Sequence, residues 1–167
     1  MDNFIRTRPD GDTHDREVCH TCGFINYQNP KIIVGSVVRH ADRILMCRRA
    51  IEPSIGLWTL PAGYMEIGET VAEGAQREAR EEACATIAID GVLAVYSLAH
   101  IAQVQIIHLA TLIGHNFAPG PESMEVRLFA WDELPWNTLA FPSVAWALKH
   151  ERMAQYGAHA TPFTAPA

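Results

Sequence analysis

The sequence predicts an α/β (α+β) fold, an α/β/α sandwich in which a helix covers each side of a mixed β-sheet. Apolar runs such as 92–99 and 104–113 lack clean alternation with polar residues, which indicates strands that are covered on both faces. Helical patterns begin at Thr70 and at Ser143, between and after these runs. The 167 residues suffice for one domain with a small appendage.

The composition limits the classes of partner. The net charge of −6 argues against broad electrostatic binding of nucleic acid, so we expect no nucleic-acid partner. No apolar run reaches the roughly eighteen residues of a membrane span, and the N-terminus lacks a secretory signal. We therefore expect a cytoplasmic protein without a membrane partner. The four cysteines are too few and too unevenly placed for a disulfide framework.

Changes in composition divide the chain into three parts. Residues 1–29 form an N-terminal arm, in which 1–18 are polar and are expected to be irregular or poorly ordered. The main domain is expected at 30–157. The remaining residues, 158–167, are small and proline-bearing, and we expect a flexible tail there.

The strands of the main domain follow from β-branched and apolar runs between turn residues. Lys31–Arg39 and Arg43–Arg49 predict a hairpin, and a short strand is expected at Leu57–Leu60. Four more strands are predicted after the first helix, at 86–89, 92–99, 104–113 and 126–131. The second helix is expected at Ser143–Tyr156, with Ser143 as its N-cap.

The first helix carries an unusual group of acids. Thr70 and Glu73 have the spacing of a capping box, which marks the helix start. Glu78, Glu81 and Glu82 then fall at i, i+3 and i+4, so their carboxylates converge on one patch and repel by about 0.2–0.5 kcal/mol per pair. A solvated acidic face is one interpretation. A divalent cation such as Mg²⁺ is the other, because it takes carboxylate oxygens as ligands.

The spacing of residues along the longer stretch from Gly63 to Glu82 decides between these interpretations. It resembles the Nudix box, a motif in which a loop, a helix and a second loop bind metal and a pyrophosphate, and its residues here are Gly63, Glu69, Arg77, Glu78, Glu81 and Glu82. The match departs from the family at its end, where Cys84 and Ala85 replace a glycine and an aliphatic residue. That departure affects the turn after the helix and leaves the metal ligands unchanged.

The resemblance implies roles for these residues. Glu78, Glu81, Glu82 and the carbonyl of Ala62 are expected to hold Mg²⁺ or Mn²⁺. Arg77 and Glu69 are expected to pair and to brace the loop. The family's general base is either the glutamate that matches Glu78 or an acid on a later loop, and the segment PGPESMEVRLF offers Glu122 and Glu125 for that role.

Three residues are candidates for binding substrate. Arg48 and Arg49 end the predicted hairpin, and either a pair of solvated arginines or a planar clamp on phosphate is consistent with that position. Tyr27 is assigned with them. It lies in the stretch YQNPKIIVG, which is similar to the same family.

The segment CHTCGFINYQNPKIIVG resembles the second half of a zinc ribbon that precedes the domain in one branch of the family. Cys19 and Cys22 are thus candidate Zn²⁺ ligands, although a structural zinc site needs four. His14 or His20 as further ligands, a site shared by two chains in a homodimer, and a degenerate site all remain open.

The resemblance extends to GLWTLPAGYMEIGET, FAPGPESMEVRLFA and LAFPS, and it favours the branch that includes pyrophosphatases of FAD and ADP-ribose. It implies Mg²⁺-dependent hydrolysis of the diphosphate of an adenine dinucleotide or a related nucleoside diphosphate, of the FAD, ADP-ribose or NADH class, with release of AMP. The alternatives are a nucleoside triphosphate pyrophosphatase and a non-catalytic nucleotide-binding regulator on the same fold.

Overall fold

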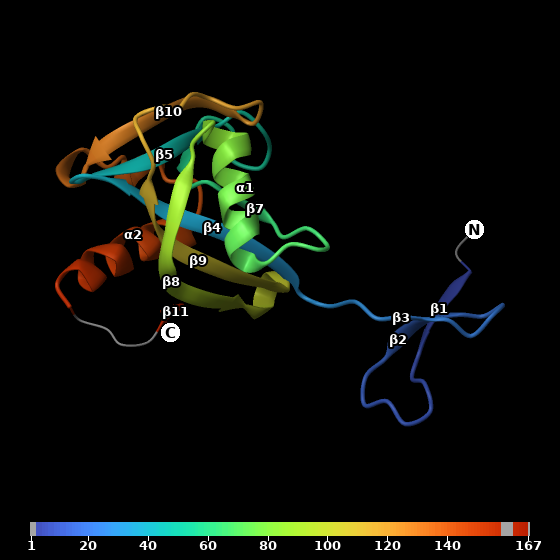
Figure 1. The fold of residues 1–167 in the computed structure, drawn as a ribbon. Coiled ribbons are helices and arrows are strands. Elements are labelled where there is room, and N and C mark those ends of the chain that lie inside the picture. The colour runs from blue at the N-terminus through green and yellow to red at the C-terminus, as the bar shows by residue number, and fades with distance from the viewer. Residues whose placement is uncertain (1–2, 158–161, 167) are drawn as a thin grey trace. The chain divides into compact units, whose positions relative to one another are not determined.

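The computed structural model describes residues 3–157 and 162–166. These residues form two compact units, Met1–Pro30 and Lys31–Ala167, which we describe separately (Figure 1). In the described part of the chain, no helix has both the length and the apolar character that crossing a membrane requires.

The N-terminal unit is a small antiparallel sheet in the order β1-β2-β3. Its strands are β1 (Phe4–Thr7), β2 (Arg16–Cys19) and β3 (Ile25–Asn26). The expectation of an irregular segment at 1–18 was therefore wrong for β1 and β2. A polar loop connects them, and in it the carboxylate of Asp12 accepts a hydrogen bond from Nε of Arg16 at 2.9 Å. Local composition gave no sign of this pairing.

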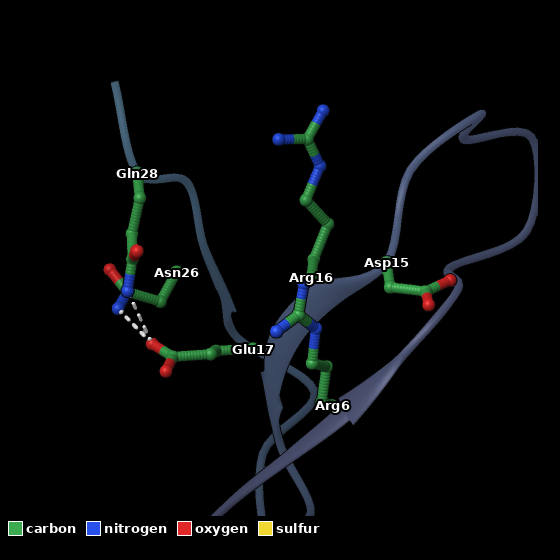
Figure 2. A pocket seen from close by; sticks show the side chains of 6 residues that line it. All are labelled: Arg6, Asp15, Arg16, Glu17, Asn26 and Gln28. Atoms are coloured by element: carbon green, nitrogen blue, oxygen red, sulfur yellow. Dashed lines mark hydrogen bonds between the residues drawn. The ribbon is translucent and has the colours of Figure 1, made fainter. Parts of the chain in front are cut away.

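A shallow pocket of about 120 Å³ lies on the N-terminal unit, lined by Arg6, Asp15, Arg16, Glu17, Asn26 and Gln28 (Figure 2). One carboxylate oxygen of Glu17 accepts hydrogen bonds from the side-chain amides of Asn26 and Gln28, at 2.8 and 2.9 Å. These bonds tie β2 to β3 and to the segment that follows it.

The main unit is built on a mixed sheet in the order β10-β5-β4-β9-β8-β11, with β6 paired to β5 and β7 paired to β4. Two pairs, β4 with β9 and β8 with β11, are parallel, and the others are antiparallel. The strands are β4 (Lys31–His40), β5 (Arg43–Arg49), β6 (Trp58–Thr59), β7 (Ala62–Tyr64), β8 (Ile87–Leu98), β9 (Gln103–Leu112), β10 (Ser123–Ala130) and β11 (Phe163–Thr164).

Two helices cover opposite faces of this sheet, as the fold class predicted. Neighbouring residues of a strand point to opposite faces. On β4, Val37 belongs to the core that holds Ala147 of α2 (Pro142–Gln155), and Val38 belongs to the core that holds Ala79 of α1 (Val71–Ala83). Short 3₁₀ turns occur at η1 (Ala99–Ile101), η2 (Trp131–Glu133) and η3 (Trp136–Thr138). The predicted sandwich is confirmed (Figure 1).

The start of each helix tests the capping predictions. Thr70 and Glu73 form the predicted capping box: the Thr70 hydroxyl accepts from the Glu73 N–H at 3.2 Å, and the Glu73 carboxylate accepts from the Thr70 N–H at 2.8 Å. The predicted cap of α2 was wrong. Phe141 occupies the N-cap position with no side-chain cap bond, and Pro142, which suits the first turn, begins the helix ahead of Ser143.

Two further expectations need correction. The strands predicted at 86–89 and 92–99 form one strand, β8, with register shifts near Gly91. The predicted flexible tail contributes β11, which pairs in parallel with β8, and the side chain of Phe163 is buried in the core beneath α2. A long-range contact of this kind leaves no mark in local composition. Residues 158–161 and 167 lie outside the described residues.

The end of α1 keeps its turn although a cysteine replaces the family's glycine. Cys84 adopts a left-handed conformation with φ of 48°, and its N–H donates to the Arg80 carbonyl at 3.0 Å. The loop after β9 then docks on this end, where the Gly120 N–H donates to the Glu82 carbonyl at 3.0 Å. A Cβ on Gly120 would overlap the Glu81 carbonyl oxygen, so only glycine fits there.

We predict that Cys84→Gly stabilises the protein by about 1 kcal/mol, because glycine adopts the left-handed conformation without the steric penalty of a side chain. For a chain of this size the gain corresponds to roughly 2–4 °C in Tm, measurable by differential scanning calorimetry. Cys84→Ala is the matched control and should change stability by less than about 0.5 kcal/mol. Equal stabilisation by both substitutions would contradict the prediction.

Candidate active site

The acids of α1 differ in burial according to their place on the helix. Ala75, Ala79 and Ala83 form the small-residue stripe that packs against the sheet. Beside that stripe, Glu78 and Glu82 lie one turn apart and are 8% and 5% exposed. The side chain of Glu81 is 60% exposed. The patch predicted from the spacing therefore consists of two buried carboxylates and one at the surface.

Arg77 connects these acids, and all five of its N–H donors are used. Its Nε and Nη2 form a bidentate pair with Glu69 at 3.0 and 2.8 Å. Its Nη1 donates to Glu78 at 2.6 Å and to Glu81 at 3.0 Å. The remaining bond runs from Nη2 to the backbone carbonyl of Tyr64 at 2.9 Å. Arg77 and Glu69 thus form the pair that the resemblance implied, and Arg77 has no donor left for a ligand.

Glu69 fixes the loop before α1. Besides Arg77, it accepts a hydrogen bond from the Glu66 N–H at 2.7 Å. These bonds hold the pKa of Glu69 at about 2, with the Arg77 side chain as the main cause. The absence of a side chain at Gly74 lets the Glu69 carboxylate lie against α1, since a Cβ there would be 2.7 Å from Glu69 Oε1.

The strand β7 brings the backbone close to the buried acids. The Ala62 N–H donates to Glu82 Oε2 at 3.0 Å. A Cβ on Gly63 would lie only 2.6 Å from the Glu78 carboxyl carbon, so a side chain there would displace the Glu78 carboxylate from its observed position. Ala62, predicted as a ligand through its carbonyl, therefore lies beside the two carboxylates predicted as ligands.

The electrostatics of the buried pair favour a cation. Burial raises the pKa of Glu82 to about 8, more than the Ala62 N–H and the nearby Arg49 charge lower it. Burial also raises the pKa of Glu78, against the opposing effect of Arg77. Such shifts indicate carboxylates whose negative charge is incompletely compensated.

The carboxylate oxygens of this site suit a hard cation that also binds ligands from outside the protein. Among the described residues no three His, Cys, Asp or Glu side chains converge closely enough to hold a metal by themselves. Mg²⁺ is commonly bound by one or two carboxylates and completes its shell with water and substrate oxygens. Glu82 and Glu78 supply such a pair.

A cavity of about 890 Å³ adjoins the carboxylates. One end is acidic and includes Glu78, Glu81, Glu82 and Glu122. Another part of the wall is mainly apolar and comes from the end of β8, η1, β9 and the start of α2; it includes Leu98, Ile101, Ile107, Phe141, Val144 and Trp146, with the polar residues His100, Gln103 and Gln105.

The position of the cavity distinguishes Arg49 from Arg48 and Glu122 from Glu125. Arg49 and Glu122 line it. Arg48 and Glu125 are absent from its described lining and instead face each other across β5 and β10, with Nη1 and Oε2 3.7 Å apart. In addition, Nε of Arg48 donates to the Gly56 carbonyl at 2.9 Å. The geometry therefore brings one arginine and one loop acid to the cavity.

The candidates in the N-terminal unit have separate surroundings. The Arg16 guanidinium lies over the ring of Tyr27, 5.2 Å from its centroid. Cys19, at the end of β2, and Cys22, on the turn to β3, are free thiols, and backbone N–H groups of that turn lower the pKa of Cys19. Two thiols do not make a four-ligand zinc site, and no third donor joins them among the described residues.

Sequence reasoning missed the apolar wall of the cavity. Phe141 and Trp146 were not among the predicted site residues, because the cavity forms only when α2 packs beside η1 and β9. The stretch LAFPS, which contains Phe141, resembles the family without indicating that this side chain lines a cavity. No local pattern marked these side chains as part of a site.

Comparison with protein families and curated proteins agrees with this geometry. A model of the NUDIX domain matches residues 29–148, and the zinc-ribbon model described as Nudix N-terminal matches residues 4–28. An ADP-ribose pyrophosphatase from Methanocaldococcus jannaschii is 30% identical over 115 residues, which cover 65% of this chain and 67% of that protein.

Solved structures show the same fold. A NUDIX hydrolase from Nitrosomonas europaea is 46% identical with a TM-score of 0.88, over 97% of this chain and 91% of that one. An ADP-ribose pyrophosphatase from Streptococcus suis is 22% identical with a TM-score of 0.64, over 81% of this chain and 98% of that one, a likeness in fold alone.

We predict that Glu82→Gln stabilises the metal-free protein at alkaline pH. The pKa of Glu82 rises from 4.5 to about 8 on folding, so the folded state holds a proton that the unfolded state releases between these values. Stability then falls as pH rises through that window. In excess EDTA the variant should be more stable than the wild type by at least about 1 kcal/mol near pH 9, and the difference should narrow towards pH 5.

Thermal unfolding at both pH values measures this difference. Glu81→Gln is the matched control, because it removes an exposed carboxylate from the same helix, and it should give a smaller gain at pH 9 than Glu82→Gln. A gain from Glu82→Gln that is the same at both pH values would contradict the assigned cause.

Proposed function

This chain belongs to the Nudix hydrolase family, and on that premise we propose that it hydrolyses the diphosphate of ADP-ribose or a related adenine dinucleotide with Mg²⁺, releasing AMP. The observation that carries the proposal is the buried carboxylate pair, Glu78 and Glu82, at one end of a large and mainly apolar cavity. The similarity to the archaeal ADP-ribose pyrophosphatase supports the choice of substrate.

Glu78, Glu82, Glu81 and the carbonyl of Ala62 would hold the metal. When bound, Mg²⁺ neutralises charge on the diphosphate oxygens and orients a water molecule. Mn²⁺ can supply the same chemistry. The chain contributes position: the Ala62 N–H orients the Glu82 carboxylate, and Arg77 orients Glu78. Glu69, through Arg77, keeps the loop before α1 in place.

Glu122 is our proposed general base. It is exposed to solvent at the acidic end of the cavity, and its charge raises the pKa of both Glu78 and Glu82, so it lies near them. Its backbone carbonyl accepts a hydrogen bond from Ala50 at 2.8 Å, which fixes the loop. Glu125, the other acid that the sequence offered, is engaged with Arg48.

The lining of the cavity favours a dinucleotide over a triphosphate. Arg49 and Arg77 are the arginines that line the cavity, and Arg77 already spends all its donors on protein groups. A triphosphate places more negative charge beside these glutamates than a diphosphate diester does. The apolar wall suits the base and the second moiety of the diester.

The substrate proposal is tested by turnover of ADP-ribose, FAD, NADH and deoxynucleoside triphosphates with Mg²⁺, followed by chromatography of the products. We expect the highest kcat/KM for a diphosphate diester, with AMP as a product. Preference for triphosphates would reject the substrate class. Failure to turn over any of them, with unchanged nucleotide binding by Glu82→Gln, would indicate a non-catalytic regulator.

Substitutions of the two loop acids, Glu122 and Glu125, test which residue is the general base. We expect Glu122→Gln to lower kcat by about 10²-fold or more, as loss of a general base typically does. Glu125→Gln should change kcat by only a few fold. The reverse order would assign the base to Glu125, and small effects from both would leave Glu78 as the base.

A further inference from the structure

Arg49 lies in the cavity wall with part of its guanidinium fixed by the protein. Its Nε donates to the Pro53 carbonyl at 2.7 Å, and Nη2 donates to the Glu52 carbonyl at 3.3 Å. The face of the guanidinium packs over the ring of Phe141, with 5.2 Å between Cζ and the ring centroid. Three contacts from two segments therefore fix the plane of this side chain.

The contacts leave one edge of the guanidinium for a ligand. Arginine has five N–H donors in a planar fork. Two of those of Arg49 are used, and the other three, on Nη1 and Nη2, have no acceptor within the described part of the chain. That end of the fork matches two oxygens of a phosphate, which arginine binds through parallel hydrogen bonds.

Phe141 links this arginine to α2. It is the N-cap residue of α2, it is half-buried, and it packs against the core that contains Val144 and Leu148. Its ring is therefore held by the fold and can fix the guanidinium plane. Lysine in place of Arg49 would offer neither a planar face to the ring nor a forked pair of donors.

We propose that Arg49 binds the substrate diphosphate on the side of the cavity facing the metal-binding carboxylates, and that Phe141 is a positioning residue that acts through Arg49. This inference rests on the proposed function and adds to it the residue that holds the phosphate before reaction. Arg49 and Phe141 line the same cavity as the carboxylates, so a diphosphate bound beside those carboxylates would share the cavity with the Arg49 guanidinium.

A double-mutant cycle on Arg49 and Phe141 tests the proposal with ADP-ribose and Mg²⁺. We expect Arg49→Ala to raise KM by about 10–100-fold and to change kcat less, because the lost charge-assisted hydrogen bonds act on bound substrate. Phe141→Leu should raise KM by a smaller factor, and Phe141→Tyr, which keeps an aromatic face, should restore it. In the Arg49→Ala background, Phe141→Leu should have no further effect.

The control is Arg127→Ala. Arg127 also packs over a phenylalanine ring, that of Phe129 at 4.8 Å, but it is absent from the described lining of the cavity. It should leave KM unchanged. Thermal unfolding of every variant shows whether a loss reflects folding.

Two outcomes would overturn the inference. If Phe141→Leu raises KM equally with and without Arg49, the ring contacts substrate directly. If Arg49→Ala leaves KM unchanged, the arginine is a structural residue.

A parallel arm measures ADP-ribose binding by calorimetry with Ca²⁺, which separates binding from hydrolysis. If ADP-ribose binding depends on Arg49 but the protein shows no turnover with Mg²⁺, the proposed reaction is refuted and this inference stands. If turnover does not depend on Arg49, this inference is refuted and the proposed reaction stands. If the unmodified protein does not bind ADP-ribose, both the reaction and the inference are refuted.

Discussion

The burial of two carboxylates on consecutive turns of α1 is the constraint on which the main unit depends. Buried, uncompensated carboxylates destabilise a folded protein unless hydrogen bonds or cations offset the loss of hydration. Here the backbone N–H of Ala62 and the guanidinium of Arg77 provide part of the compensation. The remainder, visible as the raised pKa values of Glu78 and Glu82, is what a divalent cation would supply.

This constraint explains why small residues surround the site. Gly63 leaves space for the Glu78 carboxylate, and Gly74 leaves space for Glu69 against the same helix. Gly120 lets the loop that bears Glu122 approach the C-terminal end of α1, where its N–H satisfies a free helix carbonyl. A side chain at Gly63 or Gly74 would displace the adjacent carboxylate, and a side chain at Gly120 would push its loop away from the α1 backbone. Two of these glycines therefore allow backbone to approach a carboxylate, and Gly120 allows one backbone segment to approach another.

The parts of this architecture that the sequence predicted have local causes. The capping box at Thr70, the hairpin ending at Arg49 and the spacing of the acids on α1 are each determined by residues within a few positions of one another. The predictions that were wrong have non-local causes: β1 pairs with β2 across a polar loop, and Phe163 pairs with a strand far away in the sequence. The choice of Arg49 over Arg48 belongs to the same class, because adjacent residues on a strand face opposite sides, and only the packed structure decides which side is the cavity.

The same reasoning explains why the reaction is better determined than the substrate. Charge neutralisation and water activation need acids at fixed spacing on one rigid helix, and such spacing is written in consecutive residues. Recognition of the groups on either side of the diphosphate needs surfaces from α2, η1 and β9, which meet only through tertiary packing. The Arg49–Phe141 contact connects the end of β5 in the hairpin to the N-cap of α2. Substitutions that change substrate preference are therefore expected at the start of α2 and around η1, whereas substitutions on α1 affect turnover of every substrate.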